Sequence, residues 1–473
     1  MRRVSRFLLL AMVASVLLSI LPAAPGLAGG KRLSFNKPVD LSSFSPLRTA
    51  VGTVYSADDD EEQSDHEWSA EPVIGVDNKG VIYIGGTCCI VAASPVWASF
   101  DGGKEFVELE SPGHVREWGI GAEGDIEVDD EGNMYFVDTY IPGLLSSKWS
   151  GHGETWEFTA PATGVIPGFD DRPWLAYSEK ALYLYVNHVS HTQVYSSNDG
   201  GLTYTSEGPL SWEGNTSGQP YFPGHIAADR KKGTLWVAGV VGSGSGKNAT
   251  IGSTVSTDGG KTFTEAVVTK PQRDGGFSPI FTGTAAVDAA GNGYVTWSTW
   301  DKDGCDVYYA SSTNLGKSWN KPVRVSDGRG CATFPWIVAG EDGKIALAWY
   351  QTPKVRRETA TQRFIRALTS GTTVYGGIEI PEFSPQDELA PDAPWYLHAA
   401  VVPNATAKRP QVLEERVPTK MPVLLGPMGR ELWDFLQLDI GPDGRLHITY
   451  AEKFKDSAPQ TWYLSSKGGP RLR

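Results

Sequence analysis

The chain lacks most of what a helical, membrane or nucleic-acid-binding protein needs. Past residue 28 no 3.6-residue apolar period is sustained, so helices are expected to be scarce. No second apolar run could cross a membrane. Lys and Arg total 42 against 55 Asp and Glu, a net charge of -13, so nucleic acid and anionic lipid are not expected partners. Only four cysteines occur, and no third His or Cys is in phase with His188 and His191, so no metal site is predicted.

The N-terminus has the pattern of an export signal. Arginines at positions 2, 3 and 6 precede an apolar run at 7–21, and the small residues at 26–28 suit a signal peptidase. A 15-residue run is short for a membrane span, which needs about 20 residues, although an uncleaved anchor remains the alternative. We therefore predict a signal peptide at 1–28 and a secreted protein. Cleavage removes three arginines (42 − 3 = 39 against 55), for a net charge of -16.

What the chain has in abundance is turn residues and aromatics, with 54 Gly, 31 Pro and 51 Phe, Tyr and Trp (17 + 18 + 16). One segment recurs seven times: an apolar strand, a tight acidic or Gly turn, and a second apolar strand, which is typical of a β-hairpin. The copies lie at 72–86, 125–139, 173–187, 225–239, 284–298, 335–349 and 435–449.

A second segment follows most of these hairpins. It reads SFDGGKEF at 99–106, SNDGGLTY at 197–204, STDGGKTF at 256–263 and STNLGKSW at 312–319, with a degenerate copy, WSGHGETW, at 149–156. In this segment the chain resembles the Asp-box (BNR repeat) family, whose pattern is Ser-x-Asp-x-Gly-x-Thr-Trp. The resemblance covers essentially the whole mature chain and implies a sialidase-like β-propeller.

The box aspartates are interpreted as structural. The carboxylates of Asp101, Asp199 and Asp258 can accept backbone N–H groups across their own turn, and the following glycines tolerate a positive φ. The aromatic residue that closes each box is expected to pack between neighbouring sheets. A repeated acid is a poor candidate for a unique catalytic role.

The repeats predict an all-β fold, a single propeller of four-stranded blades over residues 29–473. Seven blades is the main prediction, with six, the number found in sialidases, as the alternative. The chain end at 461–470 looks like a third strand without a fourth. SFNKPVDLS at 34–42 matches the fourth strand SWNKPVRVS at 318–326, so the N- and C-terminal strands are expected to pair and close the ring.

Three further features interrupt the repeats. A long insert at 353–394, with a basic stretch at 354–366, is a solvated loop or a substrate-contacting lid. The acidic run at 58–62 is a solvated loop, with structural calcium binding as the alternative. Cys305 and Cys331 fall on the same predicted face and are expected to form a disulfide after export. For the adjacent Cys88 and Cys89, a vicinal disulfide and two separate free thiols are both alternatives.

The strand order also predicts where a site would lie. Asp boxes mark one face of the ring, and the opposite face, a central pit, collects residues before each first strand and after each second strand. Carboxylates and aromatics dominate there, as a glycan site requires. We predict Glu71, Asp125 and Asp171 as catalytic residues and Arg172, His188, Trp300, Trp336 and Asp434 as substrate-binding residues. Glu123, Asp138, His191, His225 and Glu452 belong to the same set of strand ends.

The resemblance implies a sialidase, but the sequence departs from that pattern. Sialidases carry a Phe/Tyr-Arg-Ile-Pro motif and a three-arginine clamp for the substrate carboxylate, and no Arg-Ile-Pro occurs here. Two hypotheses follow for a monomeric secreted protein without cofactor. One is a propeller that binds, and could hydrolyse, an extracellular glycan. The other is a non-catalytic propeller for protein binding or adhesion.

Overall fold

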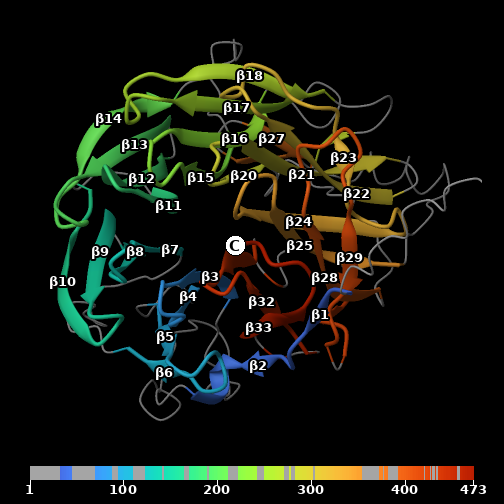
Figure 1. Ribbon diagram of the computed structural model, residues 1–473, viewed down its shortest axis with the longest axis horizontal. Helices are drawn as coiled ribbons and strands as arrows, with labels where there is room; N and C mark the ends of the chain where they lie inside the picture. The colour runs from blue at the N-terminus through green and yellow to red at the C-terminus, as the bar shows by residue number, and fades with distance from the viewer. Residues whose placement is uncertain are drawn as a thin grey trace, which may run out of the picture.

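The protein is an all-β propeller, as predicted: antiparallel sheets stand like blades around a central axis (Figure 1). The predicted signal peptide, the acidic run at 58–62 and the Cys88-Cys89 pair lie outside the described residues. The computed structural model describes residues 32–44, 70–87, 94–109, 123–140, 143–163, 170–188, 191–210, 222–241, 250–270, 276–277, 283–301, 304–353, 372–375, 378–381, 393–419, 421–426, 428, 432, 435–454, 457 and 459–473.

Four sheets each contain four antiparallel strands that pair in chain order. The first is β3 (Ala70–Val76), β4 (Ile82–Thr87), β5 (Val96–Ser99) and β6 (Val107–Glu108). The second is β7 (Gly124–Val128), β8 (Met134–Tyr140), β9 (Gly143–Ser150) and β10 (Thr155–Pro161). The third is β11 (Asp170–Ser178), β12 (Ala181–His188), β13 (His191–Ser197) and β14 (Thr205–Leu210). The fourth is β15 (Phe222–Ala228), β16 (Leu235–Val241), β17 (Thr250–Ser256) and β18 (Thr264–Thr269).

The next arc is one ten-stranded sheet, which we call the joined sheet. Its first half is β19 (Gly276–Phe277), β20 (Thr284–Val287), β21 (Gly293–Asp301), β22 (Gly304–Ser312) and β23 (Val323–Arg324). Its second half is β24 (Cys331–Ala339), β25 (Ile345–Thr352), β28 (Pro394–Val402), β29 (Leu413–Arg416) and β30 (Leu424–Leu425). The halves meet where Cys305 of β22 lies parallel to Cys331 of β24, and these cysteines form a disulfide.

The terminal sheet brings the two ends of the described chain together. It holds β31 (Gln437–Ile440), β32 (Leu446–Glu452) and β33 (Gln460–Gly468), with β1 (Ser34–Phe35) and β2 (Val39–Asp40) along the outer edge of β33. Phe35 lies opposite Ser466 and Val39 opposite Tyr463. The strand that the sequence places at 34–42 therefore runs beside the last strand of the ring (Figure 1).

The sheet count differs from the prediction of seven, or six, separate blades. Hydrogen bonds among the described residues give five sheets of four or five strands, the joined sheet, and a small hairpin of β26 (Thr372–Tyr375) and β27 (Ile378–Pro381) within the insert. The sequence pattern could not reveal the joined sheet, because the connection between its halves is a single backbone pair beside the disulfide.

Aspartates hold the turns inside the hairpins. Asp77 Oδ1 accepts the N–H groups of Lys79 and Val81 at 2.9 and 2.8 Å. Asp129 and Asp288 make the same pair of bonds in their own turns. These contacts reverse the chain within a few residues, and they explain why an acid follows so many of the first strands.

The Asp boxes have the predicted turn geometry. Asp258 accepts the backbone N–H of Thr262 at 2.9 Å and its hydroxyl at 2.6 Å, and these bonds lower the pKa of Asp258 to about 2. The closing aromatics reach the preceding sheet: the Phe106 ring lies 5.3 Å from that of Tyr463, and the Trp319 ring 6.1 Å from that of Trp236. These two boxes thus pack their sheets against the preceding sheet in the ring.

The described residues contain one helical segment, the 3-10 helix η1 (Leu41–Phe44). No helix among them is both long and apolar enough to span a bilayer.

Candidate active site at the pit face

One end of the ring gathers the starts of the first strands and the ends of the second strands. In the second sheet Gly124 lies opposite Asp138, and in the third Asp170 lies opposite His188. We call this end the pit face. The hairpin turns and Asp boxes occupy the opposite end, the turn face, because each first strand runs from one end of the ring to the other.

Several of the predicted site residues belong to strand ends at the pit face: Glu71 in β3, Asp125 in β7, Asp171 and Arg172 in β11, His188 in β12 and Trp336 in β24. For Asp171 and Trp300 the backbone alone is described, opposite Asn187 and Cys305 respectively. Asp434 lies outside the described residues.

An aromatic cluster lies where the first strands approach the axis. Trp174 is packed against His225, Trp336 and Phe435, with ring centroids 5.5, 5.5 and 5.0 Å away. His225 is in turn 5.0 Å from Trp336. These four residues come from the third, fourth, joined and terminal parts of the ring, so the cluster ties together strands that are distant in sequence.

Trp174 and Phe435 were not predicted as site residues. A partial signal for Trp174 exists: the dipeptide Pro-Trp occurs at 173–174 and 335–336 in first strands, although it also occurs at 394–395 at the start of β28. No comparable pattern marks Phe435, which immediately precedes the short strand β31.

Asp125 sits beneath this cluster and is 1% exposed. Its Oδ1 accepts the N–H of Ile126 at 3.0 Å and the Nε2–H of Gln437 at 2.9 Å, and its Oδ2 accepts the N–H of Leu175 at 2.8 Å. His225 Nε2 lies 3.6 Å from Oδ2. A buried carboxylate with three donors from three sheets holds the ring together. Its catalytic role stays a prediction.

Arg172 and Glu123 form a charged pair between the second and third sheets. The backbone N–H of Arg172 donates to Glu123 Oε2, and the guanidinium Nη2 lies 3.8 Å from Oε1. Both side chains are mostly buried, at 8% and 13% exposure. The pair places one positive and one negative group side by side at the pit face.

The other predicted pit residues are also well enclosed. Glu71 is 2% exposed and His188 is 3% exposed, with His188 Nε2 3.0 Å from the hydroxyl of Tyr195. Among the residues that the structure describes, no three His, Cys, Asp or Glu side chains gather in a way that could hold a metal ion.

Two buried acids at the pit face have the proton affinity of a general acid. Burial raises the pKa of Asp138 to about 7, although its two oxygens accept bonds from the N–H and the hydroxyl of Ser94. Burial likewise raises the pKa of Glu452 to about 7, with Tyr450 donating to its Oε1 at 2.8 Å. A carboxyl that is half protonated at neutral pH can donate a proton to a leaving group.

A cavity of about 210 Å³ follows the propeller axis from the aromatic cluster toward the turn face. Asp125, His225, Trp336 and Gln437 line it near the pit, and the first strands of the other sheets form its walls. Toward the turn face it is lined by Glu127, Asp130, Arg230, Asp439 and Arg473.

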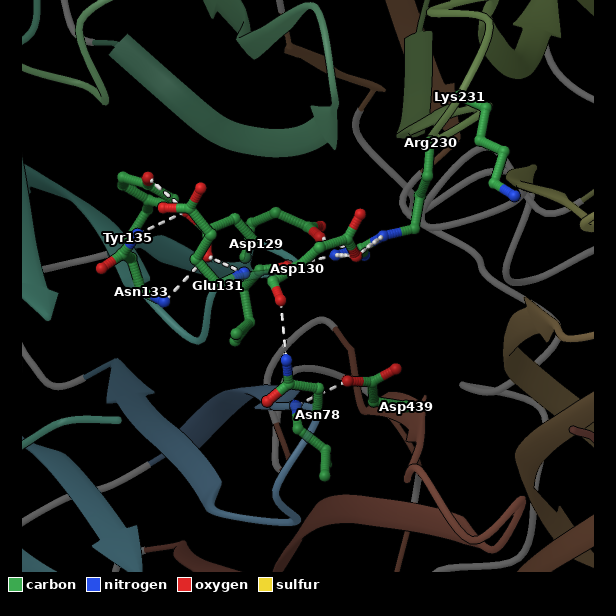
Figure 2. A network of polar contacts seen from close by, with 12 residues as sticks. Asn78, Asp129, Asp130, Glu131, Asn133, Tyr135, Arg230, Lys231 and Asp439 are labelled. Atoms are coloured by element: carbon green, nitrogen blue, oxygen red, sulfur yellow. Dashed lines mark hydrogen bonds and ion pairs between the residues drawn. The ribbon is translucent and has the colours of Figure 1, made fainter. Parts of the chain in front are cut away.

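Arg230 lies at the turn-face end of this cavity and contacts the acidic side chains there. Its guanidinium lies 3.1 Å from Glu127 Oε1 and 3.3 Å from Asp130, whose carbonyl accepts the Asn78 side chain at 2.7 Å (Figure 2). Burial raises the pKa of Glu127 to about 8. The attraction of Arg230 lowers this pKa, whereas the repulsion of Asp439 and Asp125 raises it. Burial also raises the pKa of Asp439.

The raised pKa of Glu127 predicts a loss of stability as the pH rises. The unfolded chain releases this proton near pH 4.5, whereas the folded protein keeps it to about pH 8, so the free energy of unfolding falls between these values by roughly a few kcal/mol. Glu127→Gln should remove this contribution. We expect the variant's Tm to exceed that of the parent by a margin that grows from pH 5 to pH 9.

The matched control for this prediction is Glu341→Gln, a carboxylate 57% exposed at the turn face. Its difference from the parent should stay constant over the same range. A Glu127→Gln variant that tracks the parent at every pH would show that Glu127 titrates normally.

No family model matches the sequence, and no curated protein matches it. Among the solved structures to which this fold is similar are the following three, all at low identity. An α-L-arabinofuranosidase from Fusarium graminearum, complexed with an iminosugar inhibitor, is 12% identical over 94% of this chain and 98% of its own, with a TM-score of 0.43. An α-L-arabinanase from Penicillium chrysogenum is 12% identical over 91% and 98%, with a TM-score of 0.39. The NanB sialidase from Streptococcus pneumoniae is 10% identical over 88% and 70%, with a TM-score of 0.41. These likenesses concern the fold alone.

Proposed function

We propose that this protein is a secreted propeller that binds an extracellular glycan at its pit face. The observation that carries the proposal is the combination, at one end of the axis, of the aromatic cluster around Trp336 with the Arg172–Glu123 pair and the buried acid Asp138. Sugars are recognised by aromatic faces together with charged and hydrogen-bonding groups that fix their orientation.

The proposal extends to hydrolysis of the bound glycan. Asp138 is the preferred proton donor, because burial raises the pKa of its carboxyl to about 7. Glu71 and Asp171 are the preferred partners for the role of base or nucleophile. Asp125 ranks below them because its oxygens already accept three hydrogen bonds.

The export and ring organisation predicted from the sequence are part of the same proposal. The signal peptide at 1–28 fits the disulfide between Cys305 and Cys331, since disulfides persist in oxidising compartments. A ring of seven blades stays part of the proposal: it requires the two halves of the joined sheet to count as separate blades, and the seven repeated hairpins support it.

We expect sialoside turnover to be absent or very weak. A sialic acid carboxylate needs several charge-assisted hydrogen bonds, each worth on the order of 1.5–3 kcal/mol. Among the described residues, Arg172 is the one arginine whose side chain is buried, and a single guanidinium does not make a three-arginine clamp. A glycan array of the mature protein should give binding, and a fluorogenic sialoside assay beside a panel of neutral glycosides should separate the activities.

The same assays with Asp171→Asn and Arg172→Ala connect the result to the pit. Arg445→Ala, at the turn face and 41% exposed, is the matched control and should behave as the parent. Sialoside cleavage that Arg172→Ala abolishes would make this a divergent sialidase. A mature protein that binds nothing on the array would contradict glycan binding and favour the protein-binding alternative.

A further inference from the structure

Five described residues other than glycine have a positive φ, and three of them occupy the same place in the repeat. Glu71, Arg172 and Phe334 have φ angles of 50°, 54° and 54°. Each lies in the first strand of its sheet, close to the pit face, and each precedes a proline. Positive φ is uncommon for residues with a Cβ atom.

The three residues sit in equivalent β-bulges. The pairing of the first strand with the second shifts between Ala70 and Val73, between Asp171 and Trp174, and between Thr333 and Trp336. In each case the two residues within the shift are the positive-φ residue and its proline. The ring therefore repeats one strained turn at three positions around the pit.

Glycine would adopt this positive-φ backbone without strain. The fourth sheet has a glycine at the corresponding place in the repeat, although Gly224 is not among the residues with a positive φ. There the shift between Pro223 and Ile226 encloses Gly224 and His225. At Gly224 a side chain is excluded by space, because a Cβ atom would lie 1.7 Å from the carbonyl oxygen of Gly283. At the other three positions a side chain is present in spite of the strain.

The three side chains differ in chemistry although their backbones agree. An acid, a guanidinium and a phenyl ring occur at one structural position. A purely structural requirement for the bulge would favour the same residue, glycine, in every sheet. Strained residues that the surrounding structure holds in place tend to cluster at binding and catalytic sites.

We propose that Glu71, Arg172 and Phe334 are the specificity-determining residues of the pit. This rests on the proposed glycan function and names its ligand class: a saccharide with an anionic substituent, a carboxylate or a sulfate. Arg172 pairs with that substituent, Glu71 accepts a sugar hydroxyl, and Phe334 packs against the apolar face of a ring. The strained backbone orients the three side chains before the ligand arrives.

The test replaces each residue by glycine and measures stability and binding separately. Glu71→Gly, Arg172→Gly and Phe334→Gly relieve the backbone strain but also remove side chains that are 2%, 7% and 5% exposed, so we expect a lowered Tm, most of all for Phe334→Gly. Binding of the anionic saccharide by Arg172→Gly should weaken roughly ten- to hundredfold. The probes are oligosaccharides of uronic acid, their sulfated counterparts, and neutral oligosaccharides of the same length.

Leu315→Gly is the matched control. Leu315 has a φ of 59° but belongs to an Asp box at the turn face, where it is 39% exposed. Because its side chain is exposed, Leu315→Gly should relieve the strain without losing buried packing, so its Tm should not fall and its binding should be unchanged. The uronate and sulfate probes decide which anion the pit prefers, and either preference supports the proposal.

Conservative variants keep the proposal testable where a glycine variant does not fold. Glu71→Gln, Arg172→Lys and Phe334→Leu retain most of the side-chain volume and should weaken binding with little change in Tm.

Three outcomes would contradict the proposals in different ways. If the parent protein binds an anionic saccharide and these variants bind it equally well, the specificity role is overturned and the proposed function stays intact. Preference of the parent for neutral oligosaccharides would overturn the ligand class. Parent protein that binds none of the probes would instead count against the glycan function itself.

Discussion

A protein that lacks residues 31–42 should fail to fold or should aggregate. The deletion removes β1 and β2, which pair with β33 on its outer edge. It also removes Leu33, Phe35 and Leu41, which are 3%, 8% and 0% exposed. Each buried side chain of this kind contributes about 1.5–3 kcal/mol, against a total stability of roughly 5–15 kcal/mol for a typical protein.

The exposed edge of β33 is the second reason to expect aggregation. The backbone N–H of Asn36 donates to the carbonyl of Ser465 at 2.8 Å, and Val39 and Asp40 lie opposite Tyr463 and Trp462. Without these partners, β33 presents unpaired backbone groups that can bind another chain.

Differential scanning calorimetry and size-exclusion chromatography measure this outcome. The control is a protein that begins at Arg32, which keeps both strands and the pair between Arg32 Nε and Glu415 Oε2 at 2.7 Å. It should melt as the mature protein does. Truncated protein that remains monomeric and melts at the same temperature as this control would show that the paired ends contribute little.

Features that depend on a few neighbouring residues could be predicted from the sequence. The hairpins follow from apolar strands around an acidic turn, and the Asp boxes from a short motif whose carboxylate bonds to its own turn. The apolar run directly after the insert forms β28, Pro394–Val402. These elements are local, so their signal lies within one stretch of sequence.

The contacts that build the pit have no such local signal. Gln437 donates to Asp125 across 312 positions of the chain, and its Oε1 accepts the N–H of Ile74 across 363. The strained position of Arg172 could not be foreseen either, because a residue before proline is expected in an extended conformation. Which strand ends meet on the axis is set by the closed ring.

Substitution of Asp125 should destabilise the protein more than a catalytic role would predict. Asp125→Ala leaves the N–H groups of Ile126 and Leu175 and the amide of Gln437 without their acceptor in a buried site. Each unsatisfied buried donor costs about 1–3 kcal/mol, so the three together can remove most of a typical stability of about 5–15 kcal/mol. We expect Asp125→Ala to be unfolded or to have a greatly lowered Tm.

Asp125→Asn separates the two roles of this carboxylate. Its amide offers one acceptor oxygen where the carboxylate offers two, and its NH₂ group faces other donors, so the Tm should still fall clearly. Adding Gln437→Glu supplies an acceptor for that NH₂ group, and the double variant should recover part of the loss. Asp443→Asn, at the turn face and 50% exposed, is the control and should leave the Tm unchanged. A catalytic carboxylate would behave in the opposite way: Asp125→Asn would then fold with the parent's Tm, lose glycoside turnover, and gain nothing from the change at position 437.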